Sequence, residues 1–130
     1  MNRLYMHDKH FTVAEAMQAL HQYHSVLQKM SKLAQTMMSS GNEFPGAGGE
    51  SVAVIASELP PEYQQILEII SMLDSAGIQV KSVEEGLIDF PHIRRNGEEV
   101  YLCFKLGEDT IQFWHPIEAG FAGRQPLRDL

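Results

Sequence analysis

The stretch EGLIDFPHIRRNGEEVYLCFKLGEDTIQFWHP, residues 85–116, decides the fold of the C-terminal half of the chain. Apolar and polar residues alternate within it with a period of two, which is the pattern of half-buried strands. Asn96-Gly97 predicts a two-residue hairpin turn, and Gly107-Glu108 is a plausible second one. With the short strand candidate IQVKSV before it, the stretch predicts an antiparallel β-meander over residues 78–116.

The two turns also predict a register. Val100, Leu102 and Phe104 would form one apolar face, with Asp89 opposite Phe104 and His115 opposite Val100 on that same face. At about 3.3 Å per residue and 4.8 Å per strand, Asp89 and His115 would then be roughly 16 Å apart. That distance is too long for a shared metal ion.

The other face of this register carries His92, Tyr101 and Trp114 as a cross-strand row. Such rows are usually packing, and a platform on which a ligand stacks is the alternative. Pro91 has no amide hydrogen for the ladder, so we expect the strand to bend after Asp89. The predicted register beyond the bend is therefore not fixed by the turns, which only partly restores a shared site for Asp89 and His115.

The N-terminal half has a helical pattern. Thr12 and Glu15 form a capping box at the start of a long helix over residues 12–38, where apolar residues recur every three or four positions. Residues 39–50, SSGNEFPGAGGE, predict a flexible glycine-rich linker. A second helical region is predicted over residues 52–76.

Pro60 and Pro61 interrupt this second region and fit the first turn of a helix better than its interior. Gly77 is the expected residue just past its end. Helices first and sheet second predict an α+β fold, in which a long N-terminal helical hairpin packs on a small C-terminal antiparallel β-meander. Residues 1–130 are expected to form a single domain, closed by an irregular tail over residues 117–130.

The composition limits the possible partners. The chain has 130 residues and a net charge of −7, so it lacks the positive charge that nonspecific nucleic-acid binding requires. No run approaches the roughly 20 apolar residues of a membrane span, and a single cysteine suits a reducing compartment. We therefore expect a cytoplasmic protein that binds neither nucleic acid nor membrane. The long apolar stripe of the first helix predicts a homodimer through that helix.

The candidate site combines a carboxylate, an imidazole and two guanidinium groups. We expect a polar pocket built from Asp89, Arg95, His115 and Arg124 at the seam between sheet and tail. Asp89 and His115, with Glu118 beyond, also offer the oxygen and nitrogen ligands that a divalent metal accepts, although their spacing matches no known metal motif.

Structural alternatives stand beside each of these assignments. Asp89 could be the buried ion-pair partner of Arg95 or Arg124, and His115 could be a core histidine bonded to a backbone carbonyl. Cys103 lies between apolar neighbours without an adjacent base, so it is expected to be a buried, inert thiol.

Several segments together resemble a bacterial family known as domain of unknown function number 2203. They are FTVAEA at the start of the long helix, then GLIDFP, R-x-G-x-E-V-Y-L-C, LGEDTIQFWH and GFAGRQPL in the C-terminal half. The resemblance covers nearly the whole chain and brings no established activity. The residues that it places at motif positions are Asp89, Arg95, Gly97, Glu99, Tyr101, Leu102, Cys103, Gly107, Glu108, Trp114, His115, Gly120, Phe121, Gly123 and Arg124.

Three functions are compatible with these residues. The leading hypothesis is a homodimeric binding protein whose polar pocket takes a metal ion or a small anion. The second is a metal-dependent hydrolase that uses the Asp89 carboxylate and the His115 imidazole, with His115 as ligand or general base. The third is a structural interaction module that acts through its long helix, and the sequence leaves open whether the protein is an enzyme.

Overall fold

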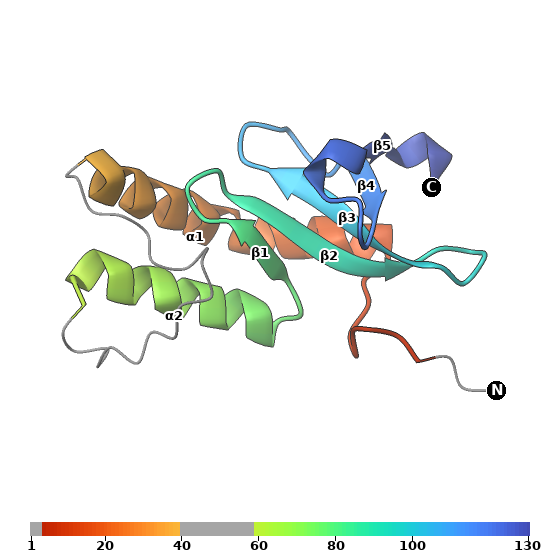
Figure 1. The fold of residues 1–130 in the computed structure, drawn as a ribbon, viewed down its shortest axis with the longest axis horizontal. Helices are drawn as coiled ribbons and strands as arrows, with labels where there is room; N and C mark the ends of the chain where they lie inside the picture. The colour runs from red at the N-terminus through yellow and green to blue at the C-terminus, as the bar shows by residue number, and fades with distance from the viewer. Residues whose placement is uncertain (1–3, 40–58) are drawn as a thin grey trace.

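The computed structural model describes residues 4–39 and 59–130. It is an α+β fold in which two helices precede a five-stranded antiparallel meander (Figure 1). The elements are α1 Val13–Ser39, α2 Pro61–Ser75, β1 Gln79–Ser82, β2 Leu87–Ile93, β3 Glu99–Lys105, β4 Phe113–Pro116, η2 Phe121–Gly123, β5 Gln125–Pro126 and η3 Leu127–Asp129. All of the predicted linker 39–50 except Ser39, and residues 52–58 of the second helical region, lie outside the described residues.

The helix ends follow the local sequence signals. The amide of Glu15 donates to Thr12 Oγ1 at 3.0 Å and the amide of Thr12 donates to Glu15 Oε1 at 2.9 Å, so the predicted capping box is confirmed. Pro61 occupies the first turn of α2, where its missing amide hydrogen has no intrahelical partner to lose. Gly77 follows α2 with φ 88°, a left-handed conformation that favours glycine.

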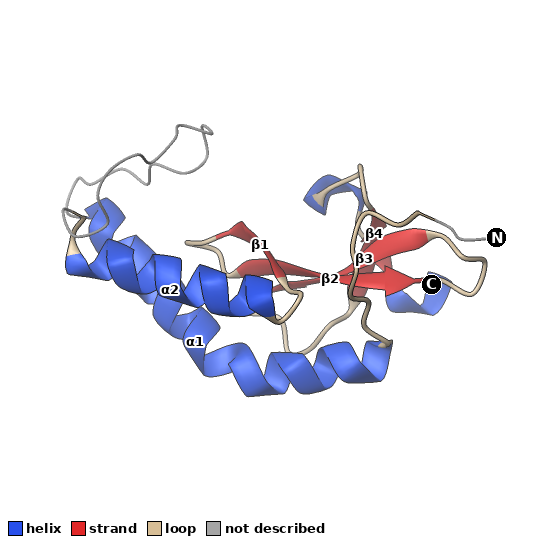
Figure 2. Cartoon of the chain, turned by 90° about the horizontal axis from the view of Figure 1, so that it is seen from below, coloured by secondary structure: helices blue, strands red, loops and turns tan. Residues whose placement is uncertain are grey.

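The two helices lie side by side; α1 runs along one face of the sheet, and α2 lies next to the edge strand β1 (Figures 1 and 2). Leu20, Leu27 and Met30 of α1 are buried in the same core as Ile66 of α2. The sheet contributes the residues that point toward the helices: Ile88, Phe90, Val100, Leu102, Phe104 and Trp114. The predicted packing of the helical hairpin on the Val100 face is therefore confirmed. None of the helices in the described ranges is long and apolar enough to cross a membrane.

The first hairpin differs from the prediction by one residue. Arg94 and Glu98 close a three-residue loop, in which the amide of Arg94 donates to the Glu98 carbonyl at 2.8 Å and Gly97 has φ 88°. This is the geometry of a turn followed by a glycine bulge rather than a two-residue turn. Asp89 consequently pairs with Cys103, not with Phe104. Because side chains alternate along a strand, a shift of one residue moves Asp89 to the other face of the sheet.

The predicted two-residue turn at Gly107-Glu108 is wrong as well, because seven residues, 106–112, connect β3 to β4. His115 pairs with Tyr101, and Trp114 pairs with Leu102. Asp89 and His115 therefore both lie on the face of the sheet away from the helices, not on the Val100 face. The predicted row of His92, Tyr101 and Trp114 does not exist, since Trp114 belongs to the helix-facing core and Tyr101 points the opposite way.

The tail is more regular than predicted. Gln125 and Pro126 pair with Trp114 and Phe113 and form a fifth strand at the edge of the meander. Trp114 Nε1 donates to the Pro126 carbonyl at 3.2 Å, which ties this strand to the core. Two short 3-10 helices, η2 and η3, flank β5, and residues 117–119 form a turn after β4.

Candidate metal centre

Three chemically different side chains meet on the face of the sheet away from the helices. Asp89 of β2 pairs with Cys103 of β3, and Cys103 pairs with Phe113 of β4, two residues before His115. Asp89, Cys103 and His115 are 2%, 1% and 2% exposed. One ligand atom from each lies within 4.8 Å of the other two, which makes them a group that could hold a metal ion.

The histidine bridges a carbonyl and the carboxylate. His115 Nδ1 lies 2.7 Å from the carbonyl oxygen of Pro116, and Nε2 lies 3.0 Å from Asp89 Oδ2. A carbonyl oxygen only accepts, so Nδ1 carries a hydrogen. The Nε2 atom then either shares a proton with Asp89 or, when deprotonated, can offer its lone pair to a metal ion. Metal-binding histidines commonly have this orientation, with one ring nitrogen donating to a carbonyl and the other free to bind.

The Asp89–His115 pair holds a proton tightly. Burial of the ring opposes its protonation, but the hydrogen bonds to Asp89 and to the Pro116 carbonyl outweigh burial, so the pKa of His115 is raised. The other carboxylate oxygen, Asp89 Oδ1, is buried and has no hydrogen-bond partner among the described residues. An unsatisfied carboxylate oxygen inside a protein is costly, and a bound cation is one of the few groups that can satisfy it.

The thiol next to the pair is protonated and unreactive. Burial, and then the charge of Asp89, raise the pKa of Cys103 to about 12. The prediction that Cys103 is buried is confirmed, and a thiol with this pKa is a poor nucleophile at neutral pH. A divalent cation among the three side chains would reverse that behaviour, because a coordinating thiol loses its proton.

Two cationic side chains, Lys81 and Arg124, lie on the same face of the sheet as the group. Lys81 of β1 places Nζ 4.9 Å from the centre of the Tyr101 ring, and that ring lies 5.5 Å from the ring of His115. Arg124 is sandwiched between the rings of Phe113 and Phe121, at 4.1 and 4.6 Å.

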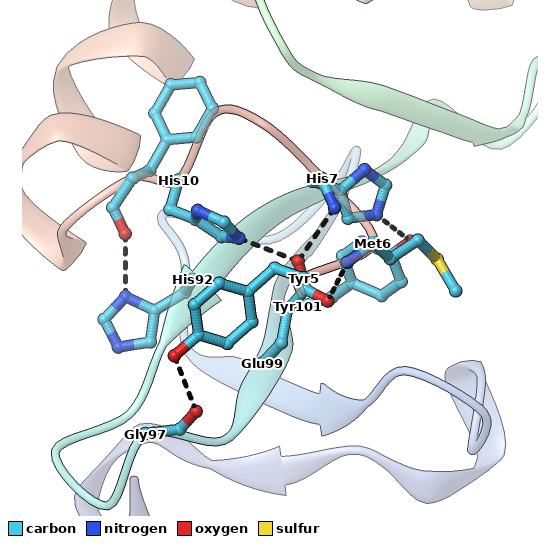
Figure 3. A network of polar contacts seen from close by, with 9 residues as sticks. Tyr5, Met6, His7, His10, His92, Gly97, Glu99 and Tyr101 are labelled. Carbon is cyan, nitrogen blue, oxygen red and sulfur yellow. Dashed lines mark hydrogen bonds and ion pairs between the residues drawn. The ribbon is translucent and has the colours of Figure 1, made fainter. Parts of the chain in front are cut away.

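The N-terminal segment covers the end of this face next to Tyr101. Figure 3 shows Glu99 accepting hydrogen bonds from the amides of Met6 and His7 and from His10 Nε2, at 2.9, 3.0 and 2.7 Å. His7 Nε2 lies 2.6 Å from the Tyr101 hydroxyl. Burial raises the pKa of Tyr101, with further contributions from the charges of Asp89 and Glu99, so the hydroxyl stays protonated. Tyr101 thus links the N-terminal segment to the ring of His115.

The structure brings together only part of the predicted pocket. Asp89 and His115 meet, although the predicted register had separated them. Arg124 lies nearby but pairs with Glu108, its Nη2 donating to Oε1 at 2.7 Å and to the Cys103 carbonyl at 3.4 Å. Arg95 is exposed in the hairpin loop and Glu118 is exposed after β4, so neither joins the group. The alternative in which Asp89 pairs with Arg95 or Arg124 is wrong, because the ion-pair partner of Asp89 is His115.

Cys103 is the member of the group that sequence reasoning missed as a ligand. The missing signal was the register: with a three-residue first loop, Asp89 and Cys103 become direct cross-strand neighbours. The cost of burying a carboxylate favours the three-residue loop, because the two-residue loop would place Asp89 in the apolar core beneath the helices.

The comparisons with known proteins agree with the resemblance in the sequence. A family model described as "Uncharacterized conserved protein (DUF2203)" matches residues 9–127. No curated protein and no solved structure matches the chain. The matched range includes every residue of the candidate metal centre, both helices and most of the tail. The chain therefore belongs to the family of uncharacterized conserved proteins defined by domain of unknown function 2203.

Proposed function

We propose that this protein binds a divalent transition-metal ion of the zinc class through Asp89, Cys103 and His115. The observation that carries the proposal is the convergence of a carboxylate oxygen, a thiol sulfur and an imidazole nitrogen within 4.8 Å in a buried site. Sulfur and nitrogen ligands select zinc and similar ions over magnesium and calcium, which prefer oxygen ligands. Three protein ligands leave one coordination position for another group.

The charges of the site suit an exchange of two protons for one dication. Without metal, the Asp89 carboxylate balances the His115 imidazolium and the Cys103 thiol is neutral. With metal, a carboxylate, a thiolate and a neutral imidazole balance the two positive charges. Both states are locally neutral, so neither leaves an uncompensated charge in the buried site.

Ionisation of the Cys103 thiol is the main energetic cost of this exchange. Ionising a thiol whose pKa is about 12 at pH 7 costs about 7 kcal/mol, at 1.36 kcal/mol per pKa unit. Structural zinc sites bind with apparent free energies of about 10–16 kcal/mol. The raised pKa of the thiol therefore weakens metal binding, and we expect an affinity below that of structural zinc sites, whose thiols ionise more easily.

The direct test is cobalt titration of protein purified without a histidine tag. Co²⁺ bound by a thiolate gives a sulfur-to-metal charge-transfer band, and Cys103 is the sole cysteine in the chain. We expect one equivalent of Co²⁺ with that band, displaced by Zn²⁺. Cys103→Ser should remove the band, and Asp89→Asn or His115→Gln should weaken binding by about a hundredfold or more. Glu118→Gln and Arg95→Gln are matched controls that should bind as the wild type does; absence of saturable Co²⁺ binding would refute the proposal.

Burial favours a binding role over the alternative of a metal-dependent hydrolase. The side chains of Asp89 and His115 are 2% and 3% exposed, so an ester or phosphoester substrate larger than a small anion would reach them only after a rearrangement. A hydrolytic metal centre keeps an accessible position for substrate and water.

We also propose a homodimer, although most of the apolar stripe on which the sequence prediction rested is used within the chain. The apolar stripe of α1 packs within the chain, since Leu20, Leu27 and Met30 are all buried in the core. The remaining support is the exposure of Met38 and Met72, at 51% and 46%. We expect light scattering to report a dimer that Met38→Glu converts to a folded monomer, and a monomeric wild type would end this part of the proposal.

A further inference from the structure

We propose, resting on the metal site above, that the remaining coordination position takes a small oxyanion, of the carboxylate or phosphate class, held by Lys81. The proposal names the ligand of the site and the residue that recognises it. It is independent of whether the protein catalyses a reaction.

Lys81 is placed over the site by an irregularity in the sheet. The pairing of β1 with β2 shifts between Val80 and Ser82, and Lys81 occupies the shifted position. Its side chain reaches across β2 to Tyr101 of β3, where Nζ lies 4.9 Å from the ring centre. Asp89 lies on the intervening strand, and Lys81 acts electrostatically on His115. The ammonium therefore lies on the same face of the sheet as the three ligand atoms, beside the Tyr101 ring that contacts His115.

Lys81 differs from the other cations of this face in having no acidic partner. Arg124 pairs with Glu108 at 2.7 Å, and Lys105 pairs with Glu85 at 3.7 Å. Within residues 4–39 and 59–130, no carboxylate lies at ion-pair distance from Lys81. Lys81 is also exposed, so its ammonium is available to a ligand arriving from solvent.

The charge of the loaded site determines the class of ligand. A dication bound by Asp89 and Cys103 is locally neutral, and Lys81 then leaves a net positive charge beside the open position. A ligand with an anionic oxygen could bind the metal and accept a charge-assisted hydrogen bond from the ammonium. The chain as a whole carries a net charge of −7, so this local positive charge runs against the overall field. The burial of the ligand atoms restricts the ligand to a small one.

The test uses Co²⁺-loaded full-length protein in a buffer of weakly coordinating anions, titrated separately with acetate and with inorganic phosphate. We expect a saturable shift of the visible cobalt bands while the thiolate charge-transfer band persists, which shows that the metal has stayed in place. A response to acetate alone assigns a carboxylate, a response to phosphate alone assigns a phosphate, and both together assign a general oxyanion site.

Lys81→Met keeps the length of the side chain and removes its charge. It should weaken anion binding by about tenfold or more, yet bind Co²⁺ at least as tightly as the wild type in the absence of anions, because a like charge has left. Lys29→Met, on the exposed surface of α1, is the matched control and should change neither quantity.

The outcomes separate the two proposals. Co²⁺ binding without an anion-dependent shift would overturn the oxyanion site and leave the metal site standing. Equal anion affinity in wild type, Lys81→Met and Lys29→Met would likewise exclude Lys81 as the recognising group. Failure to bind Co²⁺ at all would overturn both.

Discussion

His115 Nε2 lies 3.0 Å from Asp89 Oδ2, although the two residues belong to strands β4 and β2 with β3 between them. The imidazole reaches across β3, and both side chains are almost completely buried. The contact joins a cation and an anion whose separate burial would be unfavourable. The stability of the metal-free protein therefore depends unequally on the two partners.

Replacing His115 should destabilise the metal-free protein more than replacing Asp89. His115→Ala leaves a buried carboxylate without its cationic partner, and we expect a loss of about 3–5 kcal/mol. Asp89→Asn leaves a neutral imidazole whose Nε2 can accept from the new amide, so about 1 kcal/mol should be lost. Urea unfolding at pH 7 in the presence of a chelator measures both. Equal losses would mean that the pair is not ionic.

The pair should also give stability a pH dependence in the neutral range. The pKa of His115 is raised in the folded protein above its ordinary value of 6.5. Its stabilising contribution is then complete below pH 6.5 and is lost as the pH rises through the folded-state pKa. The unfolding free energy of the wild type relative to Asp89→Asn should accordingly be larger at pH 6 than at pH 9. A difference that is constant over this range would contradict the assignment.

Metal binding should release protons. At pH 6 the imidazole of His115 and the thiol of Cys103 are both protonated, and both must lose a proton to bind a metal ion. Calorimetry of Zn²⁺ binding in two buffers of different ionisation enthalpy should therefore report about two protons released per ion. Cys103→Ser should reduce the number to about one. Binding heats that do not depend on the buffer would show that the metal binds elsewhere.

Glu99 should control the order of the N-terminal segment. Hydrogen bonds from His10, Met6 and His7 overcome the effect of burial and lower the pKa of Glu99, so its contribution is present above the ordinary carboxyl pKa and is lost as the pH falls. Glu99→Ala should accelerate amide exchange at Met6 and His7 by about tenfold or more, since each hydrogen bond to a charged group contributes about 1.5–3 kcal/mol. Glu98→Ala, which removes an exposed partner of Arg94, is the control and should leave these amides unchanged.

The sequence predicted the elements better than their register. The first helix was predicted at residues 12–38 and observed at Val13–Ser39, because a capping box and a long apolar stripe are local signals. The Asn96-Gly97 pair fits both a two-residue turn and a three-residue loop with a glycine bulge. The choice between them depends on which side chains each one buries, which is a tertiary property. The misplacement of Asp89, His115 and Trp114 followed from the turn chemistry alone.

Prediction of the candidate site has the same limit, because it also depends on which strands and residues become neighbours. Asp89 and His115 were identified by residue type, because a carboxylate and an imidazole among apolar neighbours require an explanation. The predicted pocket includes Arg95 for its charge, yet Arg95 lies exposed in the first hairpin loop, whose length the sequence did not determine. Cys103 was excluded as a functional group for its apolar neighbours, and those same neighbours bury it beside Asp89. Proximity across strands decided each of these cases.

The placement of the metal-capable group on the face away from the helices has a consequence for how this protein can vary. The layer that folds the chain and the layer that would bind a ligand share only the backbone of β2, β3 and β4. Substitutions among the helix-facing residues, such as Leu102 or Phe104, reach the group only by displacing those strands. Changes in core packing and changes in ligand preference are therefore nearly separable. In a mutational screen along β3, substitutions at even-numbered positions should mainly change stability, and those at odd-numbered positions should mainly change ligand binding.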